Sequence, residues 1–230
     1  MAKNVKDAQE VAVAEAVSKT ESFFEQNGKK VIIALVALVA IFVGAYLYKT
    51  NVLDVNAIKA SELIVAAQDR FSAENPDYQV VLEGDENGAG LLDVIEQYGS
   101  TPAGNLAKHY AGVCYLHLGD LVNAEKYLSQ YSTTSGVTGE VLNAENYGLR
   151  GDIAVENDDL DAALSLYAKA VKASDNEYTS SLYIYKQVLA YAAQGNASKA
   201  EECYNELKSK HATAFDLLRR AEEAIGVATK

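Results

Sequence analysis

The sequence predicts an all-α protein, with a single N-terminal transmembrane helix followed by an α-solenoid of about three repeats and a capping helix. Three observations predict this fold class. An uncharged apolar run of 18 residues lies near the N-terminus. A pattern of small and aromatic residues returns after 39 residues and again after 37. The C-terminus has an amphipathic stretch whose polar residues suit the open end of a helical stack.

The apolar run, Val31–Tyr48, contains no charged residue and no proline. At a rise of 1.5 Å per residue, a helix of this length spans roughly 27 Å, close to the hydrocarbon thickness of a bilayer. Amines and aromatic rings stand at its two ends, where they suit the lipid headgroups. We therefore predict a membrane anchor over residues 29–49, bounded by Lys29, Lys30, Val31, Tyr46, Tyr48 and Lys49.

A cleaved signal peptide is the alternative interpretation of this run, because Val43-Gly44-Ala45 is typical of a signal peptidase site. An uncleaved anchor is favoured, since the leader is about 30 residues long and the run exceeds the usual 7–15 residues of a signal peptide. Flanking lysines, three before the run and two after it, favour a cytoplasmic N-terminus. We expect a cytoplasmic tail over residues 1–28, one crossing of the inner (cytoplasmic) membrane, and a periplasmic domain.

Charge is divided unequally along the chain. The whole chain has a net charge of −12, whereas residues 50–230 have 14 basic and 27 acidic residues, a net charge of −13. No basic stripe is available to neutralise phosphates, which argues against nucleic acid as a partner. The acidity also argues against broad adhesion to anionic lipid. The roughly 180 residues after the anchor suffice for one domain with its own core.

Residues 50–102 are predicted as a juxtamembrane region in three parts. A helix continues outward from the anchor and ends before Asn75-Pro76. An acidic, glycine-rich loop over Glu83–Gly90 does not match the ligand spacing of an EF-hand, so we interpret it as a solvated turn. A short amphipathic helix, Leu91–Tyr98, closes the region. The repeat domain with its capping helix then covers residues 103–230.

Each repeat consists of a helix A, a tight turn of Gly, Asp or Asn character, and a helix B. Small residues stand where the two helices cross, which allows a close approach, and aromatic residues fill the space beside them. Gly or Asn at the turn supplies the left-handed residue that ends helix A. The pattern residues are Gly112, Tyr115, Leu118, Gly119, Asp120, Ala124 and Leu128, then Gly151, Ala154, Asp158, Asp159, Ala163, Tyr167 and Ala170, then Tyr191, Gly195, Asn196, Ala200 and Tyr204.

These units resemble tetratricopeptide repeats, which stack into an α-solenoid. The first unit matches the pattern best. The second has Asn157 where leucine is usual, and the third has the bulkier Val188 where the small residue of helix A belongs. We expect Ala214–Val227 to form the capping helix, because Arg219-Arg220 and Glu222-Glu223 give it a polar outer face.

The sequence contains no recognisable catalytic constellation, and we predict no enzymatic activity, no cofactor, no metal site and no small-molecule substrate. His109, Cys114 and His117 share one predicted helix, but their spacings of five, three and eight residues are poor for metal ligands, which favour i, i+4. Packing in the core or in a groove is the preferred interpretation. Cys114 and Cys203 fall in different repeats, so we expect free thiols instead of a disulfide.

A protein-binding surface is the remaining candidate site. In tetratricopeptide stacks the A helices line a concave groove that receives an extended segment or a helix of a partner. The register predicts a groove that is apolar at both ends with carboxylates between them, which favours a basic and apolar partner. The predicted groove residues are Leu106, His109, Val113, Leu116 and His117 from repeat one, Glu145, Asp152, Val155 and Glu156 from repeat two, and Leu182, Tyr185 and Leu189 from repeat three.

Nearly the whole chain resembles the YfgM-like family, the membrane-anchored tetratricopeptide proteins that accompany the bacterial Sec translocon. The matching parts are a short leader, an anchor beginning at Lys29-Lys30 and a small exported repeat domain. Leu91–Asp120 and Gly148–Asp152 are especially similar to forms of that family found in Bacteroidetes. The resemblance implies a non-enzymatic protein that binds Sec translocon subunits through its anchor and passes exported chains to periplasmic chaperones.

Two other functions remain open at this point. A scaffold would tether a cell-envelope or secretion assembly through one fixed partner. A regulatory subunit of a membrane enzyme would sense through the cytoplasmic tail. Weak binding to many unfolded chains is expected of the translocon accessory, and one stoichiometric partner is expected of the scaffold.

Overall fold

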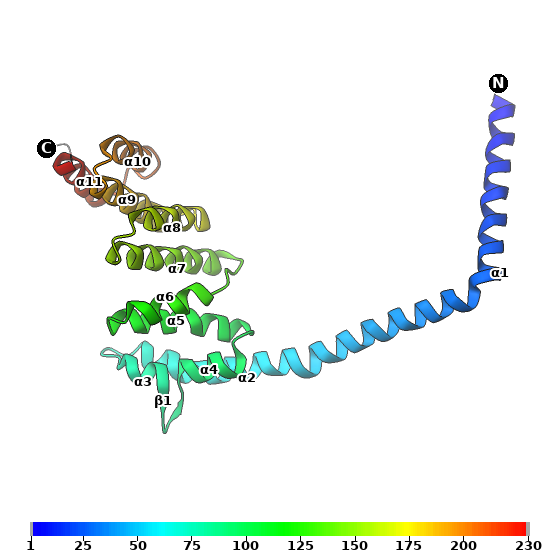
Figure 1. The fold of residues 1–230 in the computed structure, drawn as a ribbon, viewed down its shortest axis with the longest axis horizontal. Helices are drawn as coiled ribbons and strands as arrows, with labels where there is room; N and C mark the ends of the chain where they lie inside the picture. Colours follow the sequence, from blue (N-terminus) through cyan, green and yellow to red (C-terminus); the bar gives the residue numbers. More distant parts are fainter. Residues whose placement is uncertain (1, 229–230) are drawn as a thin grey trace. The chain divides into compact units, whose positions relative to one another are not determined.

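The computed structural model describes residues 2–228, with side chains described for residues 17, 18, 21, 23 and 25–227. The chain divides between residues 56 and 57 into two compact units. Across the described residues the regular structure is helical, apart from one two-stranded hairpin (Figure 1). This confirms the predicted all-α class, with one apolar N-terminal helix and a tetratricopeptide-type solenoid.

The first unit contains α1 (Ala2–Tyr48) and the π-helical turn η1 (Lys49–Leu53). The helical stretch from Glu25 onward is long and apolar enough to cross a membrane, and none of its apolar window is buried. A helix that is apolar on all sides suits a lipid surrounding. Of the predicted anchor residues, Val31 is partly buried, and the exposed ones are Lys29, Lys30, Tyr46, Tyr48 and Lys49.

The N-terminal tail is helical in the structure. Of the residues 1–28 that we assign to the tail, those from Ala2 onward belong to α1, so the helix starts well before the apolar run. Gly28 does not interrupt it, which agrees with the modest cost of glycine inside a helix, about 1 kcal/mol. The side-chain amide of Asn27 donates a hydrogen bond to the carbonyl oxygen of Phe23 at 3.2 Å.

The second unit begins with layers that precede the recognisable repeats. Helix α2 ends ahead of the predicted stop at Asn75-Pro76, and two short helices and a hairpin follow it. The predicted short helix over residues 91–98 is confirmed. The bounds are α2 (Asp54–Phe71), α3 (Tyr78–Glu83), β1 (Gly84–Asp85), β2 (Gly88–Ala89) and α4 (Leu91–Tyr98).

The acidic loop forms the hairpin. Gly84 pairs with Ala89 and Asp85 pairs with Gly88 in an antiparallel register. Arg70 of α2 donates hydrogen bonds to the carbonyl oxygens of Gly88 and Ala89, both at 3.0 Å, and it pairs with the Asp85 carboxylate. Charge-assisted bonds of this kind are stronger than neutral ones. These contacts hold the hairpin against α2. The sequence predicts a solvated turn here and gives no indication of the contact with Arg70.

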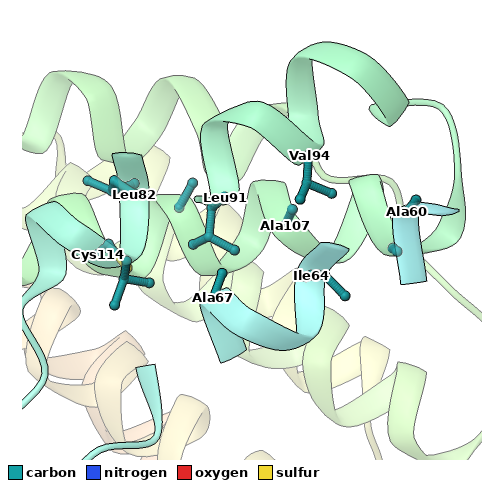
Figure 2. Packing of buried hydrophobic residues seen from close by; sticks show 11 residues of the cluster. Ala60, Ile64, Ala67, Leu82, Leu91, Val94, Ala107 and Cys114 are labelled. Atoms are coloured by element: carbon teal, nitrogen blue, oxygen red, sulfur yellow. The ribbon is translucent and has the colours of Figure 1, made fainter. Parts of the chain in front are cut away.

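One hydrophobic core joins these layers to the first repeat. Figure 2 shows side chains of α2, α3, α4 and the next helix, α5 (Pro102–His117), converging on a common centre. Cys114 of α5 is fully buried in this core, as is Ala60 of α2. The predicted juxtamembrane region (residues 50–102) and the first repeat therefore share one hydrophobic core. The labelled members are Ala60, Ile64, Ala67, Leu82, Leu91, Val94, Ala107 and Cys114.

The three predicted repeats and the capping helix are all present. Each repeat is a pair of helices joined by a short turn, and the pairs stack in chain order (Figure 1). The bounds are α5 (Pro102–His117) with α6 (Leu121–Gln130), α7 (Val137–Glu156) with α8 (Leu160–Ala173), α9 (Glu177–Ala193) with α10 (Ala197–Lys210), and the cap α11 (Phe215–Ala228).

The three A-to-B turns share one geometry. In the first, the N–H of Gly119 bonds to the carbonyl oxygen of Leu116 at 3.0 Å, and the N–H of Asp120 bonds to that of Tyr115 at 2.9 Å. These are the two bonds of a Schellman motif, which ends a helix at a left-handed residue. That residue is Gly119 (φ +76°), Asp158 (φ +58°) or Gly195 (φ +72°) in the successive repeats. The residue after it, Asp120, Asp159 or Asn196, caps helix B with its side chain.

Glycine at the helix crossings is required by the packing in the first two repeats. A Cβ atom on Gly112 would lie 2.4 Å from the Leu128 side chain, and one on Gly151 would lie 2.5 Å from the Tyr167 ring. In the third repeat Val188 occupies the corresponding position and is fully buried. Tyr204, the equivalent of Tyr167, is only partly buried there. The larger residue on helix A is thus accompanied by a ring that lies nearer the surface.

The capping helix covers the end of the stack with its apolar face. Ala221 is fully buried against α9 and α10, and Leu217, Leu218 and Ile225 pack beside it. The opposite face is polar, as predicted, because the exposed residues include Arg219, Arg220, Glu222 and Glu223. Such a cap keeps the apolar end of a solenoid from water.

The left-handed Asp158 provides a test of the turn geometry. Asp158→Gly is expected to raise the free energy of unfolding by about 0.5–1 kcal/mol, because glycine adopts a positive φ without the steric cost of a side chain. Gly119→Ala is the matched control and is expected to lower the free energy of unfolding by about 1 kcal/mol. No atom lies within 4 Å of the added Cβ, so this loss comes from the backbone strain of a positive φ alone. Urea unfolding of the full chain in detergent measures both. An Asp158→Gly variant less stable than the wild type would contradict the shared geometry.

Candidate protein-binding groove

Four of the seven predicted groove residues of repeats two and three line a pocket between α7, α8 and α9. The pocket has a volume of about 500 Å³. These four are Asp152, Val155, Glu156 and Leu189. Its remaining lining residues were not predicted as groove residues; they are Leu160, Tyr167, Lys186, Ala190 and Ala193. Most of the wall is therefore aliphatic, with polar groups from α7, α8 and α9.

Asp152 is paired inside this pocket. The Lys186 amine lies 2.6 Å from each carboxylate oxygen, and the Tyr167 hydroxyl donates to Oδ1 at 2.8 Å. The same amine lies 5.8 Å from the ring centroids of Tyr167 and Tyr183, within range of a cation–π contact. The predicted band of carboxylates is thus weaker than the sequence indicates. Glu156 is the exposed lining carboxylate, with no ion pair among the described residues.

Repeat one presents less free surface than its register predicts. Leu106 packs against the core shared with α2, and Leu116 packs against the cluster around Leu128. His117 is exposed, but its ring stacks on Tyr78 of α3 with centroids 4.2 Å apart. Val113 is partly buried. The layers that precede the repeats therefore cover part of this end of the predicted groove.

His109 is a core residue, with an exposed fraction of 2%. Its Nδ1 lies 3.3 Å from the side-chain amide of Asn146 on α7, which also donates to the carbonyl oxygen of Leu128. Its Nε2 lies 3.9 Å from the carboxylate of Glu145, whose side chain is half exposed. The ring thus joins repeats one and two and is not available to a partner, which corrects its assignment to the groove surface.

The predicted groove residues of repeat three are divided in the same way. Tyr185 is buried with an exposed fraction of 5%, and the guanidinium of Arg220 in the cap lies 5.3 Å from its ring centroid. Leu182 packs against the cluster between α7, α8 and α9. Leu189 has an exposed fraction of 36% and faces the pocket. Of the three, Leu189 is accessible to a partner.

The two thiols are free and lie in different cores. Cys114 packs with α2 and α4, whereas Cys203 packs with α9 and α11. Burial raises the pKa of Cys114 to about 12 and that of Cys203 to about 11, so both stay protonated. A protonated thiol is a poor nucleophile and a poor metal ligand. The prediction of free thiols is confirmed.

Comparison with known proteins supports the fold. No protein-family model and no curated protein matches the chain. A solved structure described as the MamA protein is similar at 19% sequence identity and a TM-score of 0.51, over 75% of this chain and 80% of that one. A second, described as MamA, matches at 23% identity and a TM-score of 0.44, over 60% of this chain and 76% of that one. The first match shows a tetratricopeptide-like helical fold; nothing in the comparisons links the chain to the YfgM-like family.

The buried His109 predicts a pH dependence of stability. Burial lowers its pKa from 6.5 to about 4, so the folded state holds a neutral ring while the unfolded chain takes up a proton near pH 6.5. The stability that this ring contributes is complete above pH 6.5 and is lost as the pH falls toward 4, by about 3 kcal/mol. Urea titrations of the wild type and His109→Gln at pH 7 and pH 4 measure the difference.

His117→Gln, on the same helix but with an exposed ring, is the matched control for the loss of a histidine side chain. The His109→Gln chain is expected to lose about 3 kcal/mol less than the wild type over this range. Equal losses in the two chains would show that the neutral His109 ring does not couple folding to protons.

Proposed function

We propose that this chain is a non-enzymatic, membrane-anchored protein-interaction module that holds a segment of a partner in the pocket between α7, α8 and α9. The observation that supports it is the aliphatic wall of this pocket, formed by Val155, Leu160 and Leu189 with Ala190 and Ala193. Pockets that are mostly apolar with a few polar groups at fixed places are typical binding sites. The pocket opens between successive repeats, where a solenoid receives extended or helical segments.

The charge of the pocket indicates the chemistry of the segment. Lys186 neutralises Asp152, so the exposed Glu156 carboxylate is left to interact with a partner. An apolar side chain that is followed by a basic residue fits this arrangement. The apolar side chain gains about 25 cal/mol for each Å² removed from water, and the basic residue pairs with Glu156. An acidic segment would be disfavoured by the domain's negative field.

The polar groups of the pocket support binding over catalysis. Burial and the neighbouring Asp152 carboxylate raise the pKa of Tyr167, so its hydroxyl stays protonated as a hydrogen-bond donor. Asp152 is occupied by this donor and by Lys186. The residues that line the pocket include no serine, cysteine or histidine next to a general base. Nucleophilic catalysis by a serine or cysteine requires such a pairing.

The anchor determines where the module works. With the N-terminus cytoplasmic, the repeat domain is periplasmic and is tethered to the membrane by the anchor. Tethering of this kind raises the effective concentration of a site for chains that emerge nearby to roughly millimolar, so weak contacts suffice. Together with the resemblance to the YfgM-like family, this favours Sec translocon subunits, exported chains or periplasmic chaperones as the partners.

A pull-down in mild detergent tests this assignment, with the full chain compared with a chain that begins at Val55. We expect translocon subunits with the full chain alone, because the anchor makes that contact. We also expect exported chains to be lost in Glu156→Lys, which reverses the exposed charge of the pocket. Glu140→Lys, an equal change at an exposed residue outside the pocket, is the control. One envelope complex recovered equally with both lengths of chain, without translocon, would favour the scaffold instead.

A further inference from the structure

A second pocket lies at the C-terminal end of the solenoid, away from the groove. It is formed where the start of α9 meets the α10–α11 connection and the start of α11. Its volume is about 490 Å³. Aromatic rings and carboxylates line it together, and no lysine or arginine is among its lining residues. The residues that matter to the argument are Glu177, Tyr178, Thr213, Phe215 and Asp216.

The two aromatic rings are unusually exposed. Tyr178 has an exposed fraction of 79% and Phe215 one of 76%, although both start helices that are otherwise well packed. Later residues of α11, such as Leu217 and Leu218, turn toward the core, whereas Phe215 does not belong to any buried cluster. Large apolar side chains gathered at one exposed place mark interaction sites.

A fixed negative charge stands next to these rings. The Thr213 hydroxyl donates to one oxygen of Glu177, and Nδ1 of His211 lies 3.1 Å from the other. These hydrogen bonds, with that from Thr213 the stronger influence, hold the pKa of Glu177 below its usual range. Glu177 is therefore ionised and held in place. Asp216 adds a second carboxylate, which pairs along its own helix with Arg219 at 2.9 Å.

We propose that this second pocket binds a basic side chain of a partner polypeptide, arginine above all, between the rings of Tyr178 and Phe215 and the Glu177 carboxylate. A guanidinium stacks on an aromatic face and at the same time donates paired hydrogen bonds to a carboxylate. The pocket offers both partners at once, and no lysine or arginine among its lining residues occupies the rings. The Glu177 carboxylate, already held by Thr213 and His211, has further lone pairs to accept from a guanidinium. This goes beyond the proposed groove, because it adds a contact for a basic segment at the other end of repeat three.

Fluorescence anisotropy with a labelled, capped (Arg-Gly)₃ hexapeptide tests the proposal on the full chain in uncharged detergent at fixed ionic strength. Removing the rings with Tyr178→Ala and Phe215→Ala is expected to weaken binding about fivefold. Removing the charges with Glu177→Gln and Asp216→Asn is expected to weaken it by about the same factor. If the double ring substitution lowers the melting temperature, the single variant Phe215→Ala, at the exposed first residue of α11, replaces it in the experiment. This single variant is expected to weaken peptide binding about twofold.

Two matched controls separate this pocket from the general acidity of the domain and from the groove. Glu96→Gln with Glu140→Gln removes the same number of charges from exposed residues elsewhere, and binding is expected to stay within about twofold. Glu156→Gln changes the groove and is expected to have equally little effect. Equal weakening by the Glu96 and Glu140 pair would mean non-specific attraction and would overturn the proposal. Unchanged binding after loss of the rings would overturn it as well.

Discussion

The contact on which the groove depends is the packing of two tyrosine rings against glycines of α7. A Cβ atom on Gly148 would lie 2.0 Å from the ring of Tyr183, and one on Gly151 would lie 2.5 Å from the ring of Tyr167. Both distances are far shorter than any carbon–carbon contact, so only glycine allows α8 and α9 to approach α7 this closely. The two rings then stack with centroids 6.3 Å apart.

The pocket chemistry follows from this placement. The stacked rings form a surface over which the Lys186 amine lies, and the Tyr167 hydroxyl is directed at the Asp152 carboxylate. The pair is thereby satisfied within the protein, where an isolated charge would be costly. What remains for a partner is an aliphatic wall with one exposed carboxylate. We propose that this site holds side chains of a polypeptide, and the proposal for the second pocket near α11 extends the same preference for basic segments.

The sequence predicts the repeat architecture well because its determinants are local. The left-handed glycines at 119 and 195, the capping side chains that follow them and the polar face of α11 can all be read from short stretches. The larger residue at position 188 can also be recognised from the sequence. The partial exposure of the Tyr204 ring that accompanies it cannot. The hairpin at residues 84–89 was missed because Arg70, a residue of another element, fastens it.

The groove is only partly predictable, because helical register gives the direction of a side chain and not its depth. His109 and Tyr185 point along the predicted face but are covered by Asn146 and Arg220 from neighbouring elements. Lys186 was missed for the same reason, since its pairing with Asp152 joins residues 34 positions apart. The signal that the sequence offers for this pair is the place of Lys186, directly after Tyr185 in a helix that also carries Tyr183.

Site-specific photo-crosslinking in living cells tests the central claim most directly. A photoreactive phenylalanine analogue at Leu189 lies in the pocket, whereas the same analogue at Val122, exposed by 81% on α6, lies outside it. We predict that the analogue at position 189 forms crosslinked adducts with partner proteins and that these adducts disappear in a chain that also carries Glu156→Lys. The analogue at position 122 is predicted to form none of these adducts. Adducts of equal yield at both positions, or adducts at 189 that are unaffected by Glu156→Lys, would contradict the assignment of this pocket as the site of partner binding.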